Sequence, residues 1–132
     1  MGWDTRITEE VPCEVLLPAM GQGALGIESR LDDIQVCEIL SELDHEHTHK
    51  AVDAERALVD ILDGGCQVPI GAYATVDGKL ITVRGLVASL NGESIYKLEK
   101  IGPVEKAINI GRELGNELLR MGADKVLKTV LP

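Results

Sequence analysis

Basic residues and long apolar runs are both scarce in this sequence. Only 13 Lys and Arg stand against 22 Asp and Glu, which gives a formal net charge of −9, and no cluster of basic residues stands out. Such a surface repels nucleic-acid phosphates and anionic lipids, so we expect no nucleic-acid and no membrane partner. The sequence also lacks a run of about 18 apolar residues and a signal-peptide pattern, which predicts a cytoplasmic protein.

Aromatic residues and paired cysteines are missing as well. Aromatics make up 2% of the 132 residues and Phe is absent, so the core must consist of Leu, Ile, Val and Ala. Cys13, Cys37 and Cys66 are odd in number and irregularly spaced, without a CxxC pair for zinc or redox chemistry. We interpret them as reduced thiols. The length of 132 residues, 45% of them hydrophobic, suits one compact domain or a small domain with an appendage.

The first thirty residues do not form a self-sufficient unit. An apolar run ends at Pro18 and is followed by "GQGALGIE", a strand-like piece with no partner sheet nearby. Val36, Leu40 and Leu43 then recur at helical spacing, and Cys37 lies on the same side, which predicts a helix with a buried cysteine. This region therefore reads as a piece of something larger.

The remaining residues predict an α+β fold. A helix is expected over 48–62, capped by Thr48 and ended by Gly64 or Gly65. Three β-rich runs follow, separated by Asp77-Gly78 and Asn91-Gly92, and these pairs are typical of antiparallel hairpins.

A last amphipathic helix is predicted over 104–121, between Pro103 and Gly122. Gly111 and Gly115 inside this helix each cost about 1 kcal/mol relative to Ala, so we expect their face to approach the sheet closely. The expected fold class is a three-stranded antiparallel sheet covered by helices, preceded by a short hinge or strand segment and a helix.

Two motifs suggest other functions but lack the required context. "HEHTH" at 45–49 matches the zinc-peptidase pattern H-E-x-x-H, yet it falls between two predicted helices and no histidine follows it as a third ligand. Gly21, Gly23 and Gly26 fit the spacing G-x-G-x-x-G, but no helix follows directly and no βαβ unit surrounds them. We expect neither a metal site nor a nucleotide site.

Three longer stretches carry a resemblance. "LLPAMGQGALGIESR" (16–30), "ERALVDILDGGCQVPIGAYA" (55–74) and "LITVRGLVASLNGE" (80–93) resemble the C-terminal part of the porphobilinogen deaminase, or hydroxymethylbilane synthase, family. The resemblance extends over essentially the whole chain, in the right order. The loop "DGGCQVPIG" differs from the family's "EGGCQVPIG" in one residue.

The resemblance implies a transferase of tetrapyrrole and haem biosynthesis. Such enzymes have three α/β domains and join four porphobilinogen units, with release of ammonia, on a dipyrromethane primer held by a thioether. The primer's cysteine matches Cys66, and Gln22 and Gly23 match residues near the bound pyrroles. The resemblance divides the chain into residues 1–45, a hinge segment, strand and helix from the junction of domains two and one, and residues 46–132, the cofactor-attachment domain.

The family's catalytic aspartate and its carboxylate-binding cations belong to the two earlier domains, and no catalytic residue is matched here. We therefore expect the chain to act with the missing N-terminal domains, on porphobilinogen and the growing pyrrole chain, and to be inactive and without dipyrromethane when alone. Cys66 follows a helix C-terminus, whose partial negative charge raises the pKa of a thiol, so we expect that Cys66 is not a hyper-reactive nucleophile by itself. A measured pKa of Cys66 well below that of free cysteine would contradict this expectation. The alternative is a stand-alone, non-catalytic domain of the same fold that acts in interaction or structure.

Overall fold

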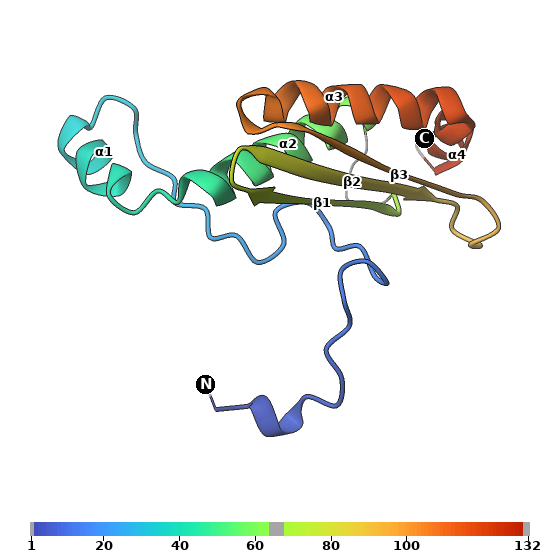
Figure 1. Ribbon diagram of the computed structural model, residues 1–132, viewed down its shortest axis with the longest axis horizontal. Helices are drawn as coiled ribbons and strands as arrows, with labels where there is room; N and C mark the ends of the chain where they lie inside the picture. Colours follow the sequence, from blue (N-terminus) through green and yellow to red (C-terminus); the bar gives the residue numbers. More distant parts are fainter. Residues whose placement is uncertain (1, 64–67, 131–132) are drawn as a thin grey trace.

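The computed structural model describes residues 2–63 and 68–130, and the described residues from 46 onward form a helical layer over an antiparallel sheet (Figure 1). The helices and strands confirm the predicted α+β class. Their bounds are α1 Ile34–Ser41, α2 Glu46–Leu62, β1 Ile70–Asp77, β2 Leu80–Ala88, β3 Ile95–Pro103, α3 Ala107–Leu118 and α4 Asp124–Val130, with short 3-10 turns at Asp4–Arg6 and Val104–Lys106.

The sheet is a meander in the order β1-β2-β3, as the two turn signals predicted. Asp77 pairs with Leu80, which leaves a two-residue loop that opens with Gly78 at φ 57°. The second hairpin has a longer loop between Ala88 and Ile95, and its Gly92 has φ 73°. Glycine reaches such positive φ values without steric cost, so these local signals set the chain reversals.

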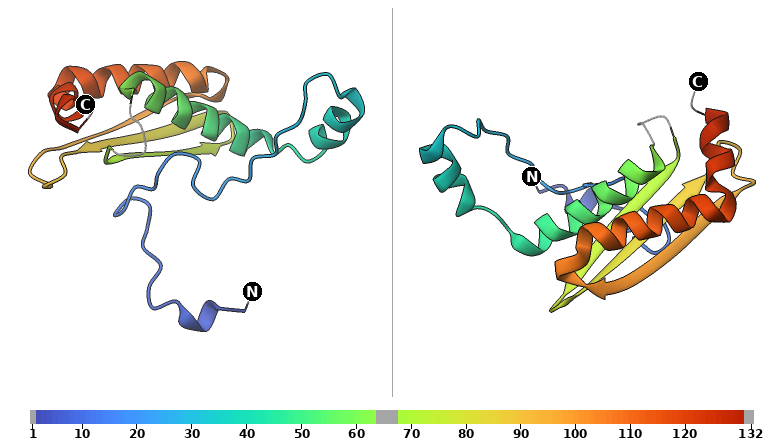
Figure 2. Two further views of the ribbon diagram at one scale, coloured as in Figure 1. Left: turned by 180° about the vertical axis from the view of Figure 1, so that it is seen from behind. Right: turned by 90° about the horizontal axis from the view of Figure 1, so that it is seen from above.

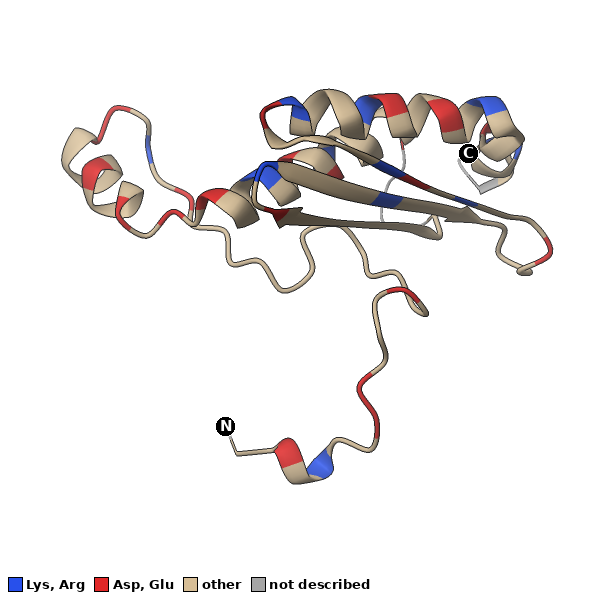
Figure 3. Cartoon of the chain, in the orientation of Figure 1, with Lys and Arg blue, Asp and Glu red and all other residues tan. Residues whose placement is uncertain are grey.

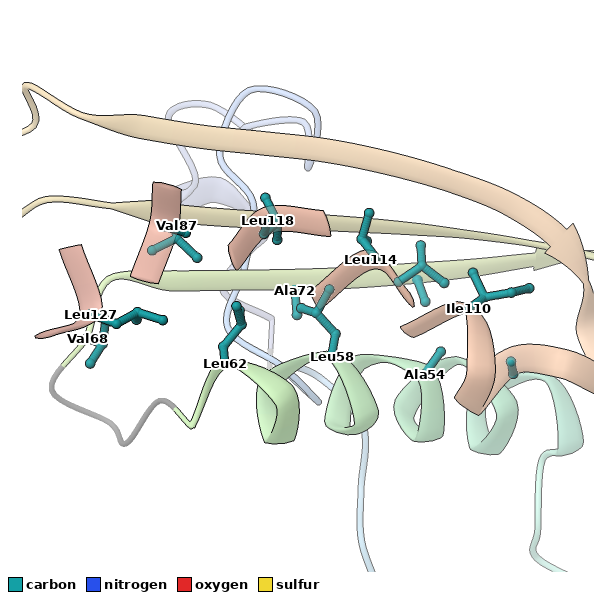
Figure 4. Packing of buried hydrophobic residues seen from close by; sticks show 14 of the residues in the cluster. Ala54, Leu58, Leu62, Val68, Ala72, Val87, Ile110, Leu114, Leu118 and Leu127 are labelled. Carbon is teal, nitrogen blue, oxygen red and sulfur yellow. The ribbon is translucent and has the colours of Figure 1, made fainter. Parts of the chain in front are cut away.

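One face of the sheet forms the core with α2 and α3. Alternate residues of β2 point at the helices and are fully buried, and leucines from both helices fill the space between them (Figure 4). Each large aliphatic side chain buried in this way contributes about 1.5–3 kcal/mol of transfer free energy. The fully buried large side chains are Leu58, Leu62, Ile81, Leu114, Leu118, Val83 and Val87.

Gly111 and Gly115 approach α2, whereas the sequence predicted an approach to the sheet. A Cβ on Gly111 would lie 2.1 Å from the carbonyl oxygen of Ala54, and one on Gly115 would lie 2.8 Å from Cβ of Ile61. Figure 2 shows α2 and α3 side by side above the sheet. The periodicity correctly identified the face of α3 that makes a close contact, but it could not show that this contact is with α2.

The predicted start of α2 is wrong by two residues, and its end is capped by a different residue than predicted. α2 begins at Glu46 with His45 as its N-cap, because the His45 ring accepts a hydrogen bond from the Thr48 N–H in place of the predicted Thr48 cap. α2 ends at Leu62, as predicted, and its C-cap is Asp63, which takes the left-handed conformation (φ 49°), as Asp can. The predicted stop residues Gly64 and Gly65 lie outside the described residues.

A short helix that the sequence analysis missed, α4, follows the predicted stop at Gly122. Gly122 has φ 114°, which is not helical, and this residue ends the preceding helical stretch with a kink. Ala123, Val126 and Leu127 are buried behind it and complete the end of the core. The chain is too short here for periodicity to reveal a helix.

The region before α2 lies apart from this core. Within residues 2–45 the structure has no strand, because an extended segment without a partner strand cannot satisfy its backbone groups in a ladder. α1 packs on no other element and none of its residues is buried, so the prediction of a buried Cys37 is wrong (Figure 1). Its thiol is half-buried and donates to the Arg30 carbonyl at 3.4 Å.

Glu14 and Leu17 lie on the face of the sheet away from the helices, and the chain then passes the edge of β1 and reaches α2 at Gly21. Leu17 covers Gly71, whose Cβ position is 3.1 Å from the Leu17 Cβ, and the Ala72 N–H donates to the Pro18 carbonyl at 2.9 Å. Leu17 and Pro18 therefore lie beside β1, the edge strand. In the described part of the chain, no helix combines the length and apolar character that a membrane span requires.

Candidate functional site

The predicted attachment residue, Cys66, lies outside the described residues, and the structure instead defines the two sides of its loop. On the helix side Leu62 is 1% exposed, and the Asp63 N–H donates to the Asp60 carbonyl at 3.3 Å. On the strand side Val68 is 7% exposed. Both sides are therefore anchored in the hydrophobic core.

The strand side is also held by backbone hydrogen bonds. The Ile70 N–H donates to the Val68 carbonyl at 2.8 Å, and the Ala88 N–H at the end of β2 donates to the Pro69 carbonyl at 3.0 Å. These bonds lead the chain directly into β1. A group attached between Asp63 and Val68 is therefore flanked on both sides by residues that are held in place at one end of the sheet.

The predicted pyrrole-proximal residues, Gln22 and Gly23, lie in an exposed turn. Gly21 and Gly23 have φ values of 66° and 84°, and the Ala24 N–H donates to the Gly21 carbonyl at 3.1 Å. A Cβ on Gly23 would have no neighbour within 4 Å. No helix follows this turn before Ile34.

A buried carboxylate, missed in the sequence analysis, joins this turn to the folded domain. Glu55 of α2 is 5% exposed and accepts two hydrogen bonds, from the Gly21 N–H at 2.7 Å and from the Ala74 N–H at 2.8 Å. The sequence position of Glu55 could have predicted its burial, because Glu55 lies one helical turn from Ala51 and from Leu58, on the apolar face of the helix.

Two features of the environment of Glu55 shift its pKa in opposite directions. Burial raises the pKa of this carboxyl above its usual value, and the N–H groups of Gly21 and Ala74 oppose the rise because they favour the charged form. Burial is the larger effect. Ionisation of Glu55 therefore costs folding stability as the pH rises from the ordinary glutamate pKa to the raised one, since the folded state holds the proton longer.

The outer face of the sheet carries charges of both signs (Figure 3). Arg84 Nε lies 2.6 Å from Glu99 and its Nη1 lies 3.5 Å from Glu14, and Lys97 donates to the Glu14 carbonyl at 2.9 Å. These side chains line a shallow hollow together with Leu98. Because its two cations already have partners within the chain, the hollow is not a free cluster of cations for a carboxylate-rich ligand.

The three histidines do not form a metal site. His45 is the N-cap of α2, while His49 lies 2.9 Å from Asp44 and 3.8 Å from Asp53. Over residues 2–63 and 68–130, no group of three or more His, Cys, Asp or Glu side chains is placed to hold a metal ion.

His49 makes the start of α2 sensitive to pH. Its hydrogen bond to Asp44, and then the charges of Asp44 and Asp53, raise the pKa of His49 above 6.5. A raised histidine pKa gives stability that is fully present below the unfolded-state pKa and is lost as the pH rises through the folded-state pKa. The effect is small because the side chain is largely exposed.

We expect Asp44→Asn to lower the pKa of His49 toward 6.5, and Asp53→Asn to lower it less. The NMR titration of the His49 ring protons measures both shifts. Asp60→Asn is the control, because this carboxylate is exposed on the same helix and makes no contact with His49. A larger shift in Asp53→Asn than in Asp44→Asn would contradict the assignment.

Comparison with known families matches this chain to one of them. The family described as "Porphobilinogen deaminase, C-terminal domain" matches residues 49–120, which covers most of α2, the whole sheet and α3. The match therefore spans more than half of the chain and includes both sides of the Cys66 loop.

Similar proteins match over nearly the full length. Curated relatives named porphobilinogen deaminase are 48% identical over 131 residues in Syntrophobacter fumaroxidans, 43% over 130 in Carboxydothermus hydrogenoformans and 44% over 131 in Desulforudis audaxviator. Each alignment covers 98% of this chain but only 42% of the relative. The chain thus spans less than half the length of these relatives.

Proposed function

Because the chain belongs to the porphobilinogen deaminase family, and to its C-terminal portion, we propose that it carries the primer-attachment cysteine of a hydroxymethylbilane synthase. The whole protein would join four porphobilinogen units and release ammonia, as a transferase of tetrapyrrole biosynthesis. The observation that supports this best is the 48% identity over 131 residues to a porphobilinogen deaminase.

In this proposal the Cys66 thiol holds a dipyrromethane through a thioether. The described residues fit such a tether, because Leu62 and Val68 anchor both sides of the loop in the core. When bound, the dipyrromethane supplies the pyrrole end on which the product is built. The chain's own contribution is to hold that attachment point at the junction of α2 and β1, while Gln22 and Gly23 approach the pyrroles from their exposed turn.

The proposal assigns the acid-base and carboxylate-binding groups to N-terminal domains outside this chain. Thirteen of the nineteen large hydrophobic residues that the structure exposes lie in the first 43 residues, and Leu25 and Leu31 are 98% and 93% exposed. So much apolar surface on one segment is typical of an interface. We infer that residues 1–45 pack on those domains, that residues 46–132 form the attachment domain, and that the isolated chain is inactive. The cytoplasmic location stays a prediction.

Intact-mass spectrometry tests the proposed function. We expect the isolated chain to have its unmodified mass of 14.2 kDa, and the full-length protein to carry the added mass of one dipyrromethane on the peptide that contains Cys66. Active full-length protein without any addition would contradict the proposal. An addition on the isolated chain would contradict only the inference that primer assembly needs the other domains.

A further inference from the structure

Glu55 is the one buried charged residue in the part of the chain that the structure describes. It stands among the core residues of α2, between Ala54 and Leu58, which are both fully buried. A carboxylate at such a position costs desolvation free energy, and an apolar side chain of similar size would pack there without that cost. Its presence therefore calls for a role beyond filling the core.

Both oxygens of Glu55 bind the backbone of segments far away in the sequence. Oε1 accepts from Ala74 of the edge strand, and Oε2 accepts from Gly21, 34 residues before Glu55. The bond to Gly21 is the shorter of the two and is made at the residue that opens the turn of Gln22 and Gly23. The carboxylate thus joins the turn, α2 and β1 at one point.

The same segment is fixed a second time just before the turn. The Pro18 carbonyl accepts from the Ala72 N–H at 2.9 Å, on the same edge of β1 that Ala74 presents to Glu55. Residues 18 to 21 are therefore held at one end on β1 and at the other end on Glu55 of α2. Since α2 continues from Glu55 to Leu62, four residues before Cys66 in the sequence, one helix relates the turn to the residue at which the described chain before Cys66 is anchored.

From this geometry we propose that Glu55 is a positioning residue, which sets the place of the Gln22–Gly23 turn relative to the loop of Cys66. The inference rests on the proposed function, because only that function gives the turn and the loop a common ligand. Glu55 does not touch the reacting atoms in this proposal. It acts through the Gly21 N–H, and a misplaced turn would slow addition of pyrrole units without affecting attachment.

Glu55→Gln in the full-length protein is the first test. A glutamine has one acceptor oxygen, and its amide NH2 would face an N–H donor, so one of the two bonds is lost. We expect unchanged dipyrromethane mass and about a tenfold lower kcat/KM, within the range that a misplacement of about 1 Å produces. Asp60→Asn, an exposed carboxylate of the same helix, is the matched control and is expected to change kcat/KM less than about twofold.

A double-mutant cycle separates positioning from a general structural effect. If Glu55 acts through the turn, Glu55→Gln lowers kcat/KM only slightly further in a Gln22→Ala background. Multiplicative effects of the two substitutions would overturn the proposal, and so would full activity of Glu55→Gln. Should Glu55→Gln fail to fold, Glu55→Asp keeps the charge but shortens the reach, and the same coupling to Gln22 is expected.

Amide hydrogen exchange gives a readout that does not depend on activity. In the 132-residue chain, Glu55→Gln is expected to speed exchange of the Gly21 amide by about tenfold or more, while the Val83 amide in the sheet centre keeps its protection. Unchanged exchange at Gly21 would also overturn the inference. Failure of the proposed function looks different, because wild-type full-length protein would then lack the dipyrromethane mass.

Discussion

Cys66→Ser in the full-length protein is expected to abolish the covalent dipyrromethane and to lower kcat by about 10³-fold or more, the scale on which a covalent catalytic group is lost. A serine hydroxyl has nearly the size of the thiol, but it is a far weaker nucleophile at neutral pH because almost none of it ionises. The loop keeps its anchors at Leu62 and Val68, so folding is expected to be unaffected. Intact mass and the rate of product formation measure the two effects.

Cys37→Ser is the matched control for this substitution. The Cys37 thiol is half-buried on α1 and bonds locally to the Arg30 carbonyl, away from the loop that carries Cys66. We expect this variant to retain the added mass and nearly full activity. Retention of the addition in Cys66→Ser, or its loss in Cys37→Ser, would show that the tether has been assigned to the wrong cysteine.

Gly111→Ala is expected to cost about 2 kcal/mol of unfolding free energy. The new Cβ would lie 2.1 Å from the Ala54 carbonyl oxygen, which belongs to a helix backbone and cannot turn aside. Separating α2 from α3 loosens the core between them, and overpacking of this kind costs about 1–3 kcal/mol or more. The gain of about 1 kcal/mol in helix propensity offsets only part of that loss.

Urea unfolding of the 132-residue chain measures this change as a shift in midpoint at constant slope. Gly26→Ala is the control, because a Cβ there has no neighbour within 4 Å and the backbone φ is not in the left-handed region. Its unfolding free energy is expected to change by less than about 0.5 kcal/mol. A loss below about 1 kcal/mol in Gly111→Ala would mean that the two helices separate easily.

Much of the fold could be predicted because its signals are local. Asp77-Gly78 and Asn91-Gly92 marked the chain reversals, and the sheet runs β1-β2-β3 as a meander. The periodic apolar residues of α2 and α3 likewise identified the helix faces that become the core. The resemblance in "DGGCQVPIG" led to the family, which the comparisons confirm.

The wrong predictions for Cys37 and Gly111 share a physical cause. Each concerns which element packs against a residue, and a local pattern in the sequence does not specify that element. Cys37 was expected to be buried because its helix is amphipathic, but α1 has no element packed on it. Gly111 was expected to face the sheet, yet it faces α2, because periodicity gives the side of a helix and leaves its partner open. The short α4 after Gly122 carried too few residues to show a period.

The sequence by itself determined the family, the α+β class, the two hairpins and the cysteine that we propose as the tether, since each depends on residues close together along the chain. Only the tertiary structure decided that Glu55 binds Gly21 and Ala74, and that residues 18–21 pass from the edge of β1 to α2. These bonds join residues 19 and 34 positions apart, and a contact over such a separation depends on how the helices and strands pack.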